Sequence, residues 1–343
     1  MALTPAQYTV FNTIADTTMS AVWSTDDAEI THERWATTHP MTEGAQIAFG
    51  WTGRMPKPRP WFGSRMLFEP AAQTYTVSPI PYELTYTQDR FILEDSNANT
   101  LSIFWRTLPD MAFQWRRHPE YELRDLIENS GIQTGPRQLG LDGLSFFNSS
   151  HPIDIYNPGF NAGGMFTAGT YCNDFTGGGV SLGGITVGGA FSQTSFASLL
   201  EYMQMIPSED GETLGVRPNF LMAPQTLQVE VNFVLKASFM AAPQWGAWSP
   251  LTGQVGTADN QLAKMGIMPI FNPFLKSTTK WYLGDNKRAF KPMIWCVREA
   301  PRTVPRVQEN DPLVWDSHRF AWGGWDRAMP AWGPSFLMSR SGP

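Results

Sequence analysis

The stretch that decides the fold is QTYTVSPIPYELTYTQDRFILED, residues 73–95, because two strand-like runs follow one another in it. In each run apolar residues alternate with polar ones, and alternation with a period of two is typical of β-strands. The apolar residues are Tyr75 and Val77 in the first run, then Tyr82, Leu84 and Tyr86 in the second. The sequence therefore predicts a long antiparallel loop made of two strands.

This extended two-stranded loop needs a surface that covers its apolar side. Two strands alone are only marginally stable in water, so the loop has to lie against something else. We expect the covering surface to belong to a neighbouring subunit, with Tyr82, Leu84 and Tyr86 in the contact.

A helix is predicted directly after the loop, at residues 108–130. Pro109 lies in its first turn, and apolar residues follow at helical spacing. Gly131 supplies the C-terminal stop, and Pro119 is expected to kink the helix or to split it in two.

The rest of the chain alternates short strands with helices, so the predicted fold class is α+β. Strands are expected at residues 220–223, 267–271, 280–283 and 292–298. Helices are expected from about Ser192 and after Pro224, the second with Val231 and Leu235 on its inner face. The glycine-rich residues 176–190 indicate a flexible loop or the tip of a ribbon, and they lack the Lys-Ser/Thr ending of a phosphate-binding loop.

Charged residues are few in this chain: they make up 16%, against 42% hydrophobic residues, and the chain contains 14 Trp and 22 Phe. Soluble proteins carry about a quarter charged residues, and large apolar patches usually mark interfaces. The composition therefore predicts an obligate assembly. Because the net charge is −6, no global basic field attracts nucleic acid, and DNA is expected to bind only weakly and without sequence preference.

No segment of the sequence points to a membrane or to secretion. The first residues, MALTPAQYTVFNT, lack the basic start and apolar centre of a signal peptide. No apolar run approaches the ~18 residues that a membrane-spanning helix needs. We expect a soluble protein that is made in the cytoplasm.

One stretch, DGLSFFNSSHP at residues 142–152, holds the residue types of a hydrolase. It contains Ser149, Ser150 and His151, and Asp154 follows shortly after. Neighbours in an extended chain point apart, the proline after His151 keeps that residue extended, and neither serine lies in a GxSxG motif. We interpret the stretch as a polar turn without catalytic function, in which an alanine substitution costs at most ~1 kcal/mol. A Ser/His hydrolase remains an alternative.

The sequence predicts no catalytic residue, no metal and no cofactor. Residues 95–99 begin like a calcium loop, but Thr100 and Arg106 replace the required Gly and Glu, so we interpret them as a polar turn. The five His residues lack zinc-site spacing. Cys172 and Cys296 form neither a CxxC motif nor a disulfide framework, which is typical of a reducing compartment.

Clustered tryptophans near the C-terminus allow another alternative, an aromatic-rich carbohydrate-binding or decoration protein. The residues are Trp315, Trp322, Trp325 and Trp332. Aromatic residues at this density in a chain with few charges more often fill cores and subunit contacts.

A set of short motifs resembles a known family through its fixed order. The motifs are Gly50-Trp51-Thr52-Gly53, Pro56, Arg59-Pro60-Trp61-Phe62-Gly63-Ser64-Arg65, Asp142-Gly143, Phe146-Phe147, His151-Pro152, residues 218–227, Trp281-Tyr282-Leu283, Lys291-Pro292, Arg298-Glu299, residues 311–314, Gly323-Gly324 and Arg327. In this order they resemble the major head (capsid) subunit of Mu-like bacteriophages, over about residues 48–330. Pro60 departs from the family, in which a charged residue is common there, and the first 48 residues match poorly.

The resemblance implies the Hong Kong 97-type capsid fold, with an N-terminal arm, an extended loop, a peripheral domain with a spine helix, and an axial domain. The implied division is residues 1–48 for the arm, 49–107 for the extended loop and flanking strands, 108–190 for the peripheral domain with the spine helix and glycine-rich loop, 191–300 for the axial domain with part of the peripheral domain, and 301–343 for a C-terminal return segment.

The resemblance also implies a function: a major capsid protein of a tailed phage, assembled in the host bacterial cytoplasm. Such a protein self-assembles into the hexamers and pentamers of an icosahedral head that encloses double-stranded DNA. Its expected partners are further copies of itself, other virion proteins such as scaffold, portal or decoration proteins, and packaged DNA without specificity, but no membrane. Trp61 and Arg65 join Tyr82, Leu84 and Tyr86 as expected subunit contacts.

Overall fold

The computed structural model describes most of the chain. It describes residues 29–42, 44–52, 72–94, 98–129, 139–154, 163–166, 168–182, 184–241, 257–308 and 310–343, with single positions elsewhere, among them Trp61 and residues 63–65. The short helix hinted at by Phe11 and Ile14, and the expected helix stop at Gly131, lie outside these residues.

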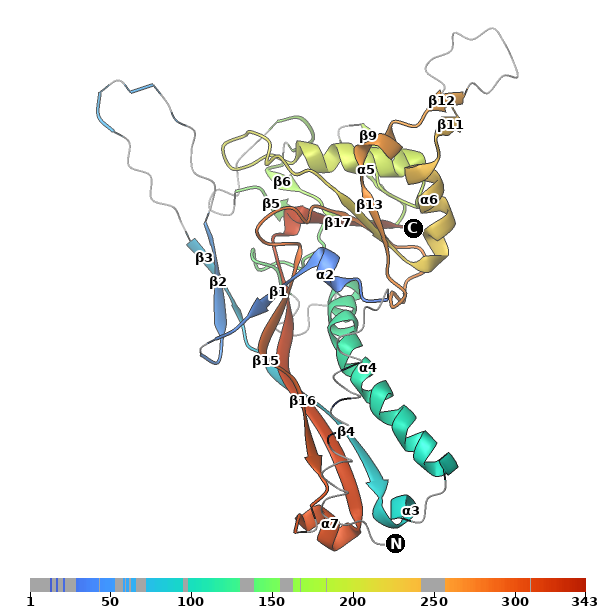
Figure 1. The fold of residues 1–343 in the computed structure, drawn as a ribbon. Helices are drawn as coiled ribbons and strands as arrows, with labels where there is room; N and C mark the ends of the chain where they lie inside the picture. Colours follow the sequence, from blue (N-terminus) through green and yellow to red (C-terminus); the bar gives the residue numbers. More distant parts are fainter. Residues whose placement is uncertain are drawn as a thin grey trace.

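An elongated four-stranded sheet forms the long half of the molecule (Figure 1). Its strands, in spatial order, are β1 (Ala36–Pro40), β15 (Met293–Arg306), β16 (Arg319–Trp332) and β4 (Ile80–Asp89). The pairs β15–β16 and β16–β4 are antiparallel, whereas β1 is parallel to β15. The predicted strand at residues 292–298 is therefore confirmed as the first part of a longer one.

The helix α4 (Ala98–Glu128) is the spine of this half and runs along one face of the sheet (Figure 1). It begins ten residues before the predicted start, so it includes Asn99 of the predicted polar turn, and Pro109 lies in its interior. The prediction that Pro119 could split the helix is wrong, because both prolines lie within one helix of 31 residues. A proline removes only its own N–H from the helical ladder. Packing of residues such as Trp115 on the sheet compensates for that loss.

The two runs of residues 73–95 do not pair with each other, so the predicted pairing is wrong. The first run is β3 (Ala72–Val77), which forms an antiparallel ribbon with β2 (Ile47–Thr52). The second run is β4 in the elongated sheet. Only two residues separate β3 from β4, and one is Pro79, which cannot adopt the positive φ that a type I′ hairpin turn needs at both positions.

The base of the β2–β3 ribbon covers the sheet face opposite α4. Val77 and Tyr75 pack there against Ile294, Cys296 and Met329 of the elongated sheet. At this end of the sheet, both faces are therefore covered by the protein's own chain.

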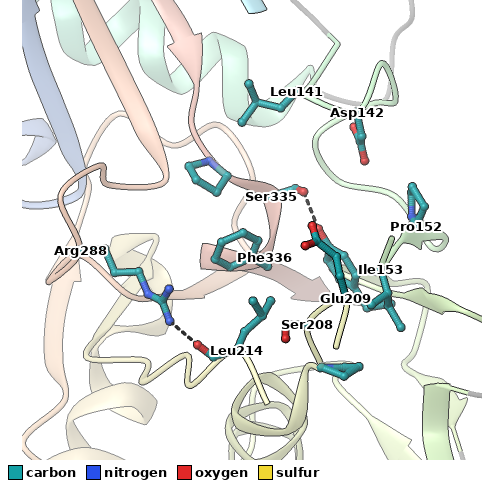
Figure 2. A pocket seen from close by; sticks show the side chains of 13 residues that line it. Leu141, Asp142, Pro152, Ile153, Ser208, Glu209, Leu214, Arg288, Ser335 and Phe336 are labelled. Carbon is teal, nitrogen blue, oxygen red and sulfur yellow. Dashed lines mark hydrogen bonds between the residues drawn. The ribbon is translucent and has the colours of Figure 1, made fainter. Parts of the chain in front are cut away.

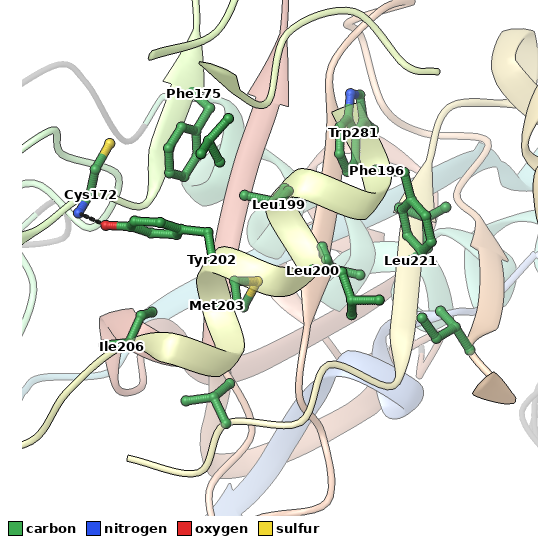
Figure 3. Packing of buried hydrophobic residues seen from close by; sticks show 14 of the residues in the cluster. Cys172, Phe175, Phe196, Leu199, Leu200, Tyr202, Met203, Ile206, Leu221 and Trp281 are labelled. Atoms are coloured by element: carbon green, nitrogen blue, oxygen red, sulfur yellow. Dashed lines mark hydrogen bonds between the residues drawn. The ribbon is translucent and has the colours of Figure 1, made fainter. Parts of the chain in front are cut away.

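A five-stranded sheet lies in the compact half, in the order β13 (Met268–Phe271), β10 (Phe220–Ala223), β14 (Trp281–Gly284), β17 (Met338–Gly342) and β7 (Asp174–Thr176). Figure 3 shows α5 (Gln193–Met205) placing Phe196 and Leu199 in the core beside this sheet. Ser192 caps α5 through the Ser195 backbone N–H. The predicted strands and the predicted start of α5 are confirmed within one or two residues.

The helix α6 (Gln228–Lys236) contributes Val231 and Leu235 to the same core, as predicted. The glycine-rich stretch forms a hairpin, which confirms the ribbon interpretation.

The remaining elements are α2 (His32–Trp35), α3 (Arg90–Glu94), α7 (Pro312–Ser317), the 3₁₀ turns Gly164–Phe166, Gln225–Leu227, Leu262–Met265 and Ser335–Leu337, and the strand pairs β5 (His151–Pro152) with β6 (Thr170–Tyr171), β8 (Val180–Leu182) with β9 (Ile185–Val187), and β11 (Phe239–Ala241) with β12 (Thr257–Asp259).

An aromatic core joins the two halves of the molecule. Phe220 and Tyr282 of the five-stranded sheet lie in one buried cluster with Trp295 and Trp332 of the elongated sheet. Phe146, from the loop that holds the DGLSFFNSSHP motif, stacks on Trp332 with ring centres 4.3 Å apart. This shared core fixes the position of the motif loop at the junction.

Candidate functional site

His151 is fully buried, whereas Ser149 and Ser150 are exposed. Its Nδ1 lies 2.5 Å from Oδ2 of Asp142, and its Nε2 lies 2.9 Å from the carbonyl oxygen of Phe146. Both ring nitrogens thus face acceptors within the chain, and neither is available to take a proton from a serine hydroxyl. The geometry does not support the Ser/His hydrolase.

Asn173 connects this histidine to the C-terminal part of the chain. Its amide oxygen lies 3.1 Å from Nε2 of His151 and accepts the backbone N–H of Asn148 at 2.8 Å. Its amide nitrogen donates to the carbonyl oxygens of Phe146 at 2.7 Å and of Ser335 at 3.0 Å. The motif is therefore a structural loop that a buried polar network fastens to the chain segment before β17.

Replacing His151 by alanine is expected to lower the free energy of unfolding by roughly 2–3 kcal/mol, because Oδ2 of the largely buried Asp142 loses its partner and a fully buried side chain is removed. This expected loss exceeds the ~1 kcal/mol expected from a polar turn, because His151 is fully buried. Urea unfolding followed by circular dichroism measures the change. Ser149→Ala, at an exposed position of the same loop, is the control and should stay within about 0.5 kcal/mol. Equal midpoints for both variants would contradict the role of the network.

A cavity of about 350 Å³ opens beside this loop (Figure 2). The polar groups around it are already engaged: the hydroxyl oxygens of Tyr171 and Ser335 lie 2.6 Å apart, and Arg288 donates to the carbonyl oxygen of Leu214 at 2.8 Å. Asp142 is held by the histidine described above. Burial raises the pKa of Tyr171 far above its usual range, so its hydroxyl stays protonated. The hydroxyl of Ser208, which also lines the cavity, donates to the carboxylate of Asp210.

Within the part of the chain that the structure describes, neither a metal site nor a membrane-spanning helix is found. No group of three or more His, Cys, Asp or Glu is arranged to hold a metal ion there, and no helix there is long and apolar enough to cross a bilayer. Cys172 and Cys296 are free and buried. Burial raises the pKa of their thiols to about 11 and about 12, so both stay protonated at neutral pH.

The four C-terminal tryptophans do not form one surface, which argues against a carbohydrate-binding platform. Trp322 and Trp332 are fully buried. Trp325 is half-buried, with the guanidinium of Arg302 lying 4.1 Å from the centre of its ring. Only Trp315 on α7 is largely exposed among the four.

Large apolar side chains are instead exposed at several places among the described residues, and at three of these places an aromatic side chain is more than half exposed. One lies at the tip of the elongated half, where α3 and α7 meet (Figure 1) and where the Arg90 backbone N–H donates to the carbonyl oxygen of His318. The second is the outer face of α6, and the third is the loop beyond β2. Their exposed residues are Phe91, Ile92 and Trp315 at the tip, Val229 and Phe233 on α6, and Trp61 in the loop.

The tip and the outer face of α6 are contact candidates that the sequence reasoning missed. Val229 is 80% exposed although it lies on a short helix with a buried stripe on its other side. Val229 and Phe233 are four residues apart, so they share one face of α6. Apolar residues on two faces of one helix are the sequence pattern that could have indicated this exposed surface.

Trp61 and Arg65, both predicted as subunit contacts, lie side by side in the loop. The Arg65 guanidinium is 5.1 Å from the centre of the Trp61 ring, and the indole N–H donates to the carbonyl oxygen of Gly63 at 2.7 Å. Trp61 is nevertheless 68% exposed. The pair presents a fixed aromatic and cationic surface to the solvent.

The apolar face of β4 is covered differently from the prediction. The Tyr82 hydroxyl donates to Glu122 of α4 at 2.7 Å, and the Tyr86 ring stacks on Trp322 at 6.1 Å. The premise that the chain itself leaves this face uncovered is wrong for the two tyrosines, because α4 and Trp322 lie against them. Both tyrosines are only partly buried, so their role as subunit contacts stays a prediction. Leu84 remains more than a third exposed.

One solved structure, the first of the three that follow, is similar enough to this chain to show the fold. A chain of the procapsid of bacteriophage JBD30 has a TM-score of 0.53 at 21% identity, with 98% of this chain and 75% of that chain covered. A chain of Microbacterium phage Oxtober96 has a TM-score of 0.49 at 9% identity, with 100% of both chains covered. The decorated JBD30 capsid gives a TM-score of 0.48 at 12% identity, with 93% of this chain and 65% of that chain covered. The fold is the α+β fold of Hong Kong 97-type phage capsid subunits.

The sequence comparison supplies the family. The family model described as Mu-like prophage major head subunit gpT matches residues 13–180 and 268–338. The chain therefore belongs to the family of Mu-like major head subunits and is a major capsid protein of the tailed-phage type. The predicted resemblance, fold and function are confirmed. No curated protein matched the sequence.

Proposed function

We propose that this subunit assembles with copies of itself into hexamers and pentamers of an icosahedral head that encloses double-stranded DNA. The observation that carries the proposal is the exposure of large apolar side chains at three separate places on one chain. Such surfaces usually mark interfaces. Three separate surfaces allow one subunit to contact several neighbours at once, as a closed shell requires.

The division of the chain that we propose follows the resemblance. The compact half with α5 and α6 corresponds to the axial domain at residues 191–300, and the elongated half with α4 corresponds to the peripheral domain. Residues 1–48 form the arm and residues 49–107 the extended loop with its flanking strands. The return segment, residues 301–343, supports this scheme because it runs through both halves. Its strand β16 lies in the elongated sheet, and its strand β17 lies in the five-stranded sheet.

Two observations suggest further partners: the net charge of this chain and the decoration of the JBD30 capsid. A chain with a net charge of −6 is suited to enclose packaged DNA without holding it by strong phosphate contacts. The JBD30 capsid is decorated with minor capsid protein trimers. We extend this to decoration, scaffold and portal proteins as partners here, with assembly in the host cytoplasm. The engaged nitrogens of His151 support a purely structural, non-enzymatic role.

Replacing Trp61 by alanine is expected to reduce the yield of shells at least tenfold, because the side chain that fills the proposed contact is lost. Truncation of a central aromatic residue in an interface commonly costs 2 kcal/mol or more, which is a factor of about 30 in binding. The measurement is negative-stain microscopy with size-exclusion chromatography, beside circular dichroism to show that the subunit still folds.

The matched control is Trp61→Phe, which keeps a ring for the Arg65 guanidinium and should assemble. Normal shells from the alanine variant would refute the contact role of Trp61. Small discrete particles from the unmodified protein would refute the proposed assembly itself, so the two failures are distinguishable.

A further inference from the structure

Four ionisable side chains gather between the spine helix and the elongated sheet. Asp326 on β16 is paired in register with Tyr82 on β4, and Glu122 and His118 face them from α4. Asp326 is only 2% exposed. Its Oδ2 lies 3.9 Å from Nε2 of His118, and the ring centres of His118 and Tyr82 lie 4.3 Å apart.

The Asp326 carboxyl group lacks the donors that a buried charge needs. Its Oδ1 and Nε2 of His118 are buried without a hydrogen-bond partner in the described part of the chain. Tyr82 does not supply one, because its hydroxyl donates to Glu122. An unpaired buried carboxylate is costly, whereas a neutral carboxylic acid is tolerated.

We propose that Asp326 is a proton-operated latch, which holds α4 on the elongated sheet when the carboxyl group is protonated and loosens this contact when it is ionised. The latch is a property of the single subunit, so it goes beyond the proposed assembly and does not depend on it. Because Asp326 lies on β16 and faces α4, release of its proton acts on the packing of the spine helix against the sheet.

The electrostatics around the latch favour the protonated form. Burial, and next the negative charge of Glu122, raise the pKa of Asp326 to about 7. Burial also lowers the pKa of His118, against the opposing effect of Glu122, so this imidazole is neutral near neutral pH. A neutral His118 cannot offset the charge of an ionised Asp326.

Charged residues on β15 lie next to Asp326 in the sheet register, and two of them contact other groups. The guanidinium group of Arg302 lies over the ring of Trp325. Oε1 of Glu299 lies 3.8 Å from Nη1 of Arg327. Arg298 has one buried guanidinium nitrogen without a hydrogen-bond partner among the described residues, and it forms no ion pair with Asp326 there. No cation other than His118 lies within 4 Å of the Asp326 carboxylate in the described ranges.

The sign of the pH dependence follows from the raised pKa. The folded chain binds a proton at Asp326 more tightly than the unfolded chain, so the stabilisation is complete at low pH and is lost as the pH rises through about 7. For one such group, the equilibrium constant for unfolding increases roughly fourfold between pH 6.5 and 8.5.

The test is urea unfolding of the full chain at pH 6.5 and 8.5, for the unmodified protein and for Asp326→Asn. We expect the unmodified protein to show the fourfold increase in excess of the Asn variant, which keeps the shape but cannot ionise. Amide hydrogen exchange, corrected for the intrinsic pH effect, should show faster opening of α4 at pH 8.5 only in the unmodified protein.

Two further variants sharpen the test. Glu122→Gln removes the nearby charge and should move the midpoint of the pH dependence to lower pH. Asp316→Asn, at an exposed position on α7, should leave it unchanged. The proposal is overturned if Asp326→Asn retains the full pH dependence, or if Glu122→Gln leaves the midpoint in place. The second measurement decides the matter even if the Asn variant does not fold.

Discussion

Replacing Glu120 by alanine is expected to lower the free energy of unfolding by roughly 3–5 kcal/mol, because it breaks a buried charged network. Glu120 lies on α4 and is fully buried. One carboxylate oxygen accepts the backbone N–H groups of Thr31 and His32, which begin the short helix α2. The other accepts the side-chain amide of Asn272 at 3.1 Å. The Thr31 hydroxyl also donates to this second oxygen at 3.3 Å, so removing the carboxylate deprives four buried donors of their acceptor.

The matched control for Glu120 is Glu33→Ala, because Glu33 lies on the same short helix α2 with its side chain exposed. That variant should stay within about 0.5 kcal/mol of the unmodified protein. Glu120→Gln keeps one acceptor oxygen and should fall between the two. Chemical unfolding followed by circular dichroism measures all three. An alanine variant with an unchanged midpoint would show that the network does not hold the N-terminal segment to the spine helix.

Replacing Trp332 by alanine is expected to cost roughly 3–5 kcal/mol, the usual range for removing a large buried aromatic side chain. Trp332 is fully buried, stacks on Phe146 with an angle of 10° between the rings, and meets the edge of Phe147 at 6.2 Å. It lies in the core that joins the two halves of the molecule. The variant should therefore loosen the motif loop as well as the sheet.

Comparing Trp332→Phe with Trp281→Phe separates the loss of packing from the loss of a hydrogen bond. The indole N–H of Trp332 has no hydrogen-bond partner in the described residues, so phenylalanine loses only part of the packing. The indole N–H of Trp281 donates to the carbonyl oxygen of Gly189 at 3.0 Å, so phenylalanine there also loses a buried hydrogen bond, and the Ser341 hydroxyl remains as the partner of that carbonyl. We expect Trp281→Phe to be the more destabilising change. Trp315→Ala, at an exposed site, is the neutral control.

Local patterns in the sequence determined the elements of the compact half. Ser192 caps α5, Val231 and Leu235 lie on the buried face of α6, and β10 occupies the predicted residues. Each of these signals is contained within a few neighbouring residues, through capping, helical spacing or a short apolar run. The ordered motifs in the sequence also sufficed for the family, which the family model confirms.

Only the tertiary structure decided which elements pair and which polar groups are buried. Alternation along Tyr82, Leu84 and Tyr86 showed a strand, but the partner of that strand, β16, lies more than 230 residues further along the chain. The sequence predicted only a polar turn around His151, because its partner Asn173 is 22 residues away. Such pairings depend on contacts between distant segments, and a local pattern carries no information about them. The sequence alone therefore determined the elements and the family, while long-range packing decided the network around Glu120, the shared core at Trp332 and the latch at Asp326.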